Sequence, residues 1–174
     1  MCTLDTFQID LKRLEEGVTH FQFDLNDDYF KAIEAPEVEH GAVHVDLEVK
    51  RRGDMFELDF HCSGVVHVPC DICLDDMEQP IDTRNRLVAQ LGEVESGDDD
   101  ELLTVDENEG VLDTSWVIYE FIALDIPIKH VHAEGECNPV MMEKLSQLDA
   151  SHSDEEHDEG EIDPRWEKLK NLKV

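Results

Sequence analysis

Two cysteines separated by two residues, Cys70 and Cys73, carry the most definite chemistry in this sequence. Two thiolates at this spacing, placed on a turn between strands, supply half of a tetrahedral structural zinc site. The other two ligands must come from elsewhere in the chain, and Cys137 with His132 or His130 can supply them. The sequence thus predicts one of two arrangements: a zinc site made of Cys70, Cys73, His132 and Cys137, or a cysteine pair that caps a tight turn without metal.

A dithiol redox centre is the other chemistry that this spacing serves. Such a centre needs a cysteine whose thiol pKa is lowered so that it forms a thiolate, usually at the N-terminus of a helix. Here the pair follows the strand-like segment 65–69, and the negative charges of Asp71, Asp75 and Asp76 are expected to raise a thiol pKa. The sequence also has no Gly-rich phosphate loop and no recognisable nucleophile motif. We therefore expect a structural or interaction module and not an enzyme.

A series of predicted strands places the cysteine pair at a turn. Alternation of apolar and polar residues predicts strands in the first half of the chain, over 7–11, 18–25, 42–49 and 55–60. Ser63 and Gly64 are expected to interrupt the last of these strands as a bulge. A strand over 65–69 then leads into the cysteine pair, and one over 77–91 leads away. The pattern predicts an α+β fold with an antiparallel β meander or open barrel.

Three predicted helices accompany the strands. Asn26 is expected to cap a short helix that runs through Ile33. Asp113 is expected to cap a second helix over 113–125, which has almost no polar face and should therefore be buried. Asn138 and the following proline are typical of a third helix start. The fold class therefore includes one buried helix and short C-terminal helices.

Acidic residues greatly outnumber basic residues in this chain. Asp and Glu number 44 against 14 Lys and Arg, which gives a net charge of −30, and segments 95–109 and 149–163 contain no Lys or Arg. Nucleic-acid affinity depends largely on Lys and Arg that neutralise phosphates, so direct RNA binding is disfavoured. An acidic surface instead attracts basic proteins, although the charge can also simply keep a small protein soluble.

Composition predicts the domain organisation and the compartment. We expect a single α+β domain over 1–148 with an acidic loop near 95–110, a disordered acidic linker over 149–162, and a short C-terminal helix over 163–174. The N-terminus lacks the pattern of a secretory signal, and the longest apolar stretch, 116–126, is too short to cross a membrane. Five cysteines without a signal peptide predict reduced thiols and a cytoplasmic location.

The order of these features resembles the bacterial YceD family, the large ribosomal RNA subunit accumulation family. The resemblance rests on the following features, in chain order: Cys70-x-x-Cys73-Leu74, an acidic loop, Leu124-Asp125-Ile126-Pro127, a further cysteine, an acidic spacer, and Asp163-Pro164-Arg165-Trp166-x-x-Leu169-x-x-Leu172. The resemblance implies a role in accumulation or maturation of large-subunit ribosomal RNA and no known enzymatic activity. Many members carry a second cluster of several cysteines after the helix, whereas this chain has only Cys137 there, with His130 and His132 nearby.

The charge and the resemblance together predict an indirect effect on RNA. We expect a non-enzymatic factor that binds a basic ribosomal protein or a large-subunit assembly factor, and no membrane. The terminal helix has two alternatives, docking on a partner or packing on its own domain, and its candidate partner-binding residues are Asp163, Arg165, Trp166 and Leu169. The competing function is a zinc-stabilised protein-protein interaction module without a ribosomal role.

Overall fold

A computed structural model of the chain describes residues 4–92 and 102–148. The chain divides into two compact units, residues 1–138 and 139–174, which we describe separately. The strands of the first unit are β1 (Gln8–Asp10), β2 (Gly17–Leu25), β3 (His40–Arg52), β4 (Met55–Pro69), β5 (Asp76–Gly92), β6 (Leu102–Asp106) and β7 (Val111–Asp113). Its helices are α1 (Asp27–Ala32), α2 (Ser115–Asp125) and the short 3₁₀ turns Leu4–Phe7 and Leu11–Arg13.

The main sheet of the first unit has five strands in the order β2-β3-β4-β5-β6. Strands β2 to β5 form an antiparallel meander, which confirms the prediction, while β6 lies parallel to β5. The periodicity of a short strand says nothing about its direction, so the sequence could not predict this parallel pair. A second sheet pairs β1 with β7. The described residues therefore form an α+β fold with no closed barrel.

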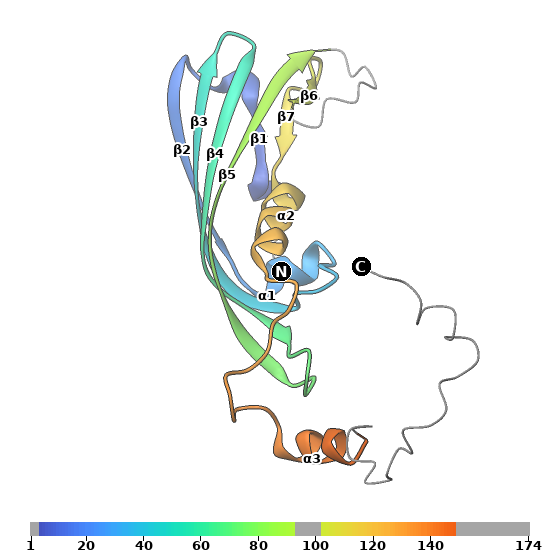
Figure 1. Ribbon diagram of the computed structural model, residues 1–174. Helices are drawn as coiled ribbons and strands as arrows, with labels where there is room; N and C mark the ends of the chain where they lie inside the picture. The colour runs from blue at the N-terminus through green and yellow to red at the C-terminus, as the bar shows by residue number, and fades with distance from the viewer. Residues whose placement is uncertain (1–3, 93–101, 149–174) are drawn as a thin grey trace, which may run out of the picture. The chain divides into compact units, whose positions relative to one another are not determined.

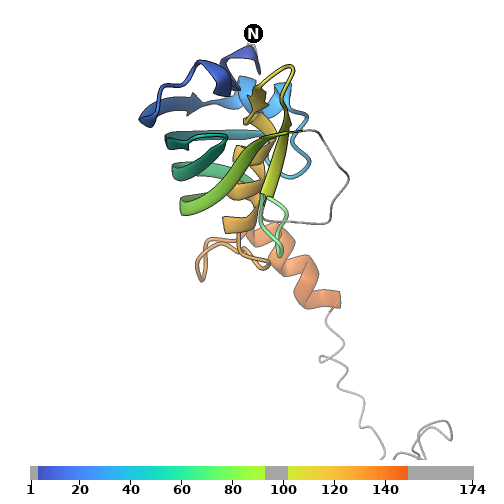
Figure 2. The same cartoon turned by 90° about the horizontal axis from the view of Figure 1, so that it is seen from above.

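The sheet curves around the helices, which lie on its concave side (Figures 1 and 2). Residues that alternate along β3 and β4 face this side and form the core; examples are Val45, Leu47, Leu58 and Phe60. The ring of Phe60 packs edge-on against Phe121 of α2, with 5.2 Å between centroids. Each such buried side chain contributes roughly 1.5–3 kcal/mol. The concave side therefore positions α2, and with it the loop that follows.

Helix α2 is only half buried, which corrects the predicted burial. Ile118 and Ile122 are fully buried, but Trp116 is 46% exposed and Leu124 is 81% exposed. A helix on one face of a sheet buries only the stripe that faces the sheet, whatever the other side contains. The cap also differs, because the N-cap is Thr114, and the Asp113 carboxylate accepts hydrogen bonds from the backbone and hydroxyl of Ser115.

Strand β4 passes through Gly64 without a bulge, contrary to the prediction. The register against β3 and β5 is continuous from Met55 to Pro69 on the β5 side and from Met55 to His67 on the β3 side. A Cβ atom at Gly64 would lie 2.2 Å from the carbonyl oxygen of Ala42. Gly64 therefore permits a close approach of two strands and does not interrupt the sheet.

The short helix α1 begins as predicted. The side chain of Asn26 accepts hydrogen bonds from the backbone N–H groups of Asp28 and Tyr29. The hydroxyl of Tyr29 in turn donates to the Ser115 carbonyl at 2.6 Å, which ties α1 to the start of α2.

The second unit contains helix α3 (Pro139–Leu148), which begins at the predicted proline. The predicted linker 149–162, the terminal helix 163–174 and its residues Asp163, Arg165, Trp166 and Leu169 lie outside the described residues, as does much of the acidic loop near 95–110. The division into a domain of 1–148, a linker and a terminal helix stays a prediction. None of the described helices has the length and apolar character needed to span a membrane.

Candidate metal centre

Cys70 and Cys73 lie in the tight turn between β4 and β5, as their sequence context predicts. The backbone N–H of Cys70 donates to the carbonyl of Asp75 at 2.8 Å, and Leu74 N–H donates to the Cys70 carbonyl at 2.9 Å. Leu74 takes a left-handed conformation, with a φ of 62°. Both cysteines are buried, with exposures of 0% and 1%. The two sulfur atoms are therefore held on the inside of a closed turn.

A second segment, the loop over 126–138 that follows α2, is fastened to this turn. The N–H of Asp71 donates to the His130 carbonyl at 3.0 Å, and the N–H of His130 donates to the Asp71 carboxylate at 2.9 Å. The side-chain amide of Asn138 donates to the Asp75 carboxylate at 2.9 Å. Sequence reasoning missed this role of Asp71 and Asp75, because no local pattern reveals a hydrogen bond across 59 or 63 residues.

These contacts bring all four predicted ligands together. One ligand atom from each of Cys70, Cys73, His132 and Cys137 can be chosen so that all lie within 4.8 Å of one another. The sulfur atoms of Cys70 and Cys137 are 3.9 Å apart, and Cys73 Sγ lies 3.4 Å from His132 Nδ1. A tetrahedral zinc ion with ordinary Zn–S and Zn–N bonds requires about 3.8 Å between sulfurs and about 3.5 Å from sulfur to nitrogen. The cluster therefore fits a metal ion of this size.

The structure also decides between the two candidate histidines. The ring of His130 lies outside the cluster, with its Nδ1 3.0 Å from the carbonyl of Pro127 and its Nε2 3.7 Å from Asp71. His132 Nδ1, in contrast, lies 3.4 Å from Cys73 Sγ. His130 is held by its contacts with Asp71 and Pro127, so only His132 joins the cysteines.

Hydrogen bonding lowers the pKa of the Cys70 thiol in the cluster. Burial raises the pKa of Cys70, but hydrogen bonds from the backbone N–H groups of Cys73, His132 and Ile72 and from the His132 ring outweigh it and lower that pKa to about 6. The expectation that acidic neighbours would raise a thiol pKa is therefore wrong for Cys70, since these donors point at the sulfur while the Asp71 and Asp75 carboxylates accept hydrogen bonds elsewhere.

The pKa values of two other groups in the cluster, His132 and Cys137, are raised. The pKa of His132 is raised, chiefly by its hydrogen bond to Cys70. Burial, followed by hydrogen bonds to Cys70 and Cys73, raises the pKa of Cys137 to about 11. A second thiolate is thus disfavoured beside the first unless a cation shares the site. A divalent metal ion would supply that charge and favour ionisation of the other thiols.

A comparison with known protein families matches residues 58–173 to the family described as large ribosomal RNA subunit accumulation protein YceD. The match covers more than half of the chain and includes most of β4, the cysteine turn, α2 and all four residues of the cluster. The chain belongs to the YceD family. Membership confirms the resemblance found in the sequence, and the family name implies a role in large-subunit ribosomal RNA accumulation. Searches of curated proteins and of solved structures give no match.

Proposed function

We propose that this YceD-family protein is a non-enzymatic cytoplasmic factor that supports accumulation or maturation of large-subunit ribosomal RNA in bacteria by binding a basic ribosomal protein or assembly factor. Membership of the family supports the proposed role in accumulation of large-subunit ribosomal RNA. The net charge of −30 supports the choice of a basic protein as the direct partner, because such a chain repels RNA phosphates. The effect on RNA is then indirect.

The charges on the main sheet support this choice of partner. Arg86 Nε lies 2.7 Å from the Asp59 carboxylate, and Lys50 Nζ lies 3.0 Å from the same side chain and 2.8 Å from Glu48. Nearby histidines pair with carboxylates too, such as His61 with Asp82 at 2.9 Å. RNA would have to draw these cations away from their carboxylate partners, whereas Lys and Arg of a protein would find acceptors on the same face.

A structural zinc ion is the second part of the proposal. Cys70 and Cys73 belong to the turn between β4 and β5, and His132 and Cys137 belong to the loop after α2, so a metal ion would join two segments far apart in the sequence. The same geometry supports the competing function, a zinc-stabilised interaction module without a ribosomal role. The two functions share the metal centre and differ only in the partner.

The terminal segment with Asp163, Arg165, Trp166 and Leu169 is proposed as an additional partner contact. It combines apolar residues with cations in a chain otherwise dominated by acids. This proposal rests on the sequence of the segment alone.

Sedimentation of cell extracts tests the proposed function. We expect an epitope-tagged full-length protein to co-sediment with precursors of the large ribosomal subunit, and cells without the protein to contain less large-subunit than small-subunit ribosomal RNA. Absence from all precursor fractions, together with a normal ratio of the two RNAs, would favour the competing interaction module. Tight binding of the purified protein to large-subunit ribosomal RNA at physiological salt would contradict the indirect mechanism.

A further inference from the structure

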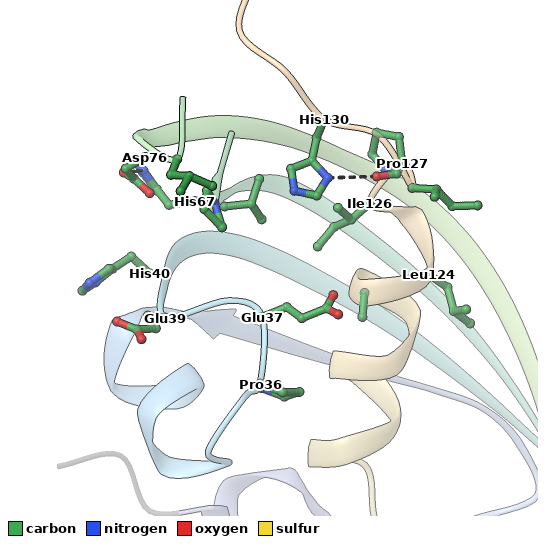
Figure 3. Close-up of a pocket in the computed structure, with 15 residues that line it drawn as sticks. Pro36, Glu37, Glu39, His40, His67, Asp76, Leu124, Ile126, Pro127 and His130 are labelled. Carbon is green, nitrogen blue, oxygen red and sulfur yellow. Dashed lines mark hydrogen bonds and ion pairs between the residues drawn. The ribbon is translucent and has the colours of Figure 1, made fainter. Parts of the chain in front are cut away.

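A groove of about 1030 Å³ lies beside the metal centre in the first unit. Its walls come from the loop before β3, the end of β4 with the cysteine turn, and the end of α2 with the loop that follows (Figure 3). The groove belongs to neither the core nor the cysteine cluster, because its lining includes none of the four candidate ligands. It is large enough to receive several side chains of another protein.

Three large apolar side chains in the lining of this groove are exposed. Ile128 is fully exposed, Leu124 is 81% exposed and Leu74 is 69% exposed. They come from three separate segments, namely the loop after α2, the end of α2 and the cysteine turn. Single exposed apolar residues are ordinary on protein surfaces, but three in the lining of one groove indicate an interaction surface.

Acidic side chains occupy other parts of the lining. Glu37 and Glu39 lie on the loop before β3, and Glu37 extends from that loop toward the end of α2 (Figure 3). Asp76 lies at the start of β5 and pairs with His67 at 2.8 Å. None of the described residues that line the groove is Lys or Arg. The groove therefore offers apolar contact together with negative charge and has no fixed positive charge of its own.

We infer that this groove is the docking site for a segment of a basic protein that carries both large apolar side chains and Lys or Arg. The inference rests on the proposed function and names the surface through which it operates. Leu74, Leu124 and Ile128 would contact the apolar side chains, and Glu37 and Glu39 would accept the cations. Charge complementarity selects this occupant, since an acidic or phosphate-rich ligand would be repelled by the same carboxylates.

The metal centre shapes this docking site. Leu74 follows Cys73 directly, and Ile128 and His130 lie on the loop that supplies His132 and Cys137. Two hydrogen bonds between Asp71 and His130, one of them to the Asp71 carboxylate, connect these two walls. A metal ion in the cluster would therefore hold the segments that carry Leu74 and Ile128 in one arrangement before the partner arrives, which reduces the entropic cost of binding.

Binding to the isolated proteins of the large ribosomal subunit, freed of RNA, tests this inference. The measurement compares the full-length protein with the variant Leu124→Asp/Ile128→Asp, which changes only exposed side chains and should fold normally. We expect wild-type protein to bind a basic member of the set, identified by mass spectrometry, and the variant to bind it at least about tenfold more weakly. The matched control is Val18→Asp/Met55→Asp, which alters two exposed apolar residues near the opposite end of the sheet and should bind as wild type does.

A second pair of variants tests the charges. Glu37→Gln/Glu39→Gln should weaken binding about three- to tenfold at low salt and reduce its salt dependence. Glu107→Gln/Glu109→Gln makes the same change of charge in the turn between β6 and β7 and should have little effect. Circular dichroism of every variant confirms that it is folded.

The possible outcomes distinguish failure of the groove inference from failure of the proposed function. If wild type and the groove variants bind the same ribosomal protein equally well, the docking site is wrong and the proposed function stands. If the wild type binds none of the subunit proteins, the proposed partner class fails and the groove inference fails with it. If the purified protein binds large-subunit ribosomal RNA directly and the groove variants lose that binding, the occupant is a nucleic acid and the inference is overturned.

Discussion

At the residue scale, Cys70 is the member of the cluster whose surroundings most favour a thiolate. Donors from Cys73, His132 and Ile72 surround its sulfur, and its side chain is fully buried. A low thiol pKa suits both a nucleophile and a metal ligand, but burial keeps reagents away from this sulfur. Together with three further candidate ligand atoms within 4.8 Å, the arrangement favours a structural metal ion over a reactive thiol.

Replacement of Cys73 by serine tests the metal centre. A hydroxyl is a poor zinc ligand at neutral pH, and a three-ligand remnant holds the metal weakly. We expect purified wild-type protein to contain about one zinc ion per chain and Cys73→Ser to retain roughly a tenth of that after gel filtration. Elemental analysis measures both contents.

Cys62 provides the matched control for this substitution. It is also buried, but it lies in the core of the main sheet, where burial raises the pKa of its thiol to about 11. Cys62→Ala should keep the full zinc content and lose about 1 kcal/mol of stability through the smaller side chain. Equal loss of zinc in both variants would show that the metal is not held by the cluster.

At the element scale, strand β4 connects the core with the metal centre. It pairs with β3 and β5 along its length and ends at Pro69, directly before Cys70. Its continuity depends on Gly64, where a side chain would collide with the Ala42 carbonyl and with Val43 Cα at 2.7 Å. These are backbone atoms of a paired strand and cannot move aside alone.

Substitution of Gly64 tests this close approach. Gly64→Ala should destabilise the protein by about 2–4 kcal/mol, since one added carbon forces two paired strands apart. Gly92→Ala is the control, because its nearest non-neighbour atom would lie 3.7 Å from the new Cβ, and its stability should change by less than about 1 kcal/mol. Urea denaturation monitored by circular dichroism measures both values. A similar, small change in both variants would contradict the predicted collision.

At the scale of the whole molecule, the metal centre and the hydrophobic core are separate. Cys70 and Cys73 are buried beside the main core but do not belong to its cluster of apolar side chains, which extends through the sheet, α1 and α2. We therefore expect the core of the first unit to remain folded without metal, unlike small zinc modules that unfold without it.

Removal of the metal with a chelator tests this separation. We expect the far-ultraviolet circular dichroism to persist and the melting temperature to fall by several degrees, because only the stabilisation from metal binding is lost. Hydrogen exchange followed by mass spectrometry should increase in residues 70–75 and 126–138 and stay unchanged in β3 and β4. Complete unfolding on chelation would show that the core alone is insufficient.

The sequence alone determined the local features of this protein. The two-residue period of β3 predicted a strand with one buried face, Asn26 predicted the start of α1, and the order of motifs predicted the family. Each of these properties depends on residues close together in the chain or on their order along it. Residue type and spacing also predicted the four candidate metal ligands.

Only the tertiary structure decided which distant groups meet. It selected His132 over His130, because the pairing of Asp71 with the loop sets which histidine faces the cysteines. It reversed the predicted pKa direction of Cys70, since backbone donors around the sulfur outweigh nearby carboxylates. It also exposed Leu124 beside an acidic groove on a helix expected to be buried. Side-chain direction and long-range contacts arise from packing, and neither is encoded in local spacing.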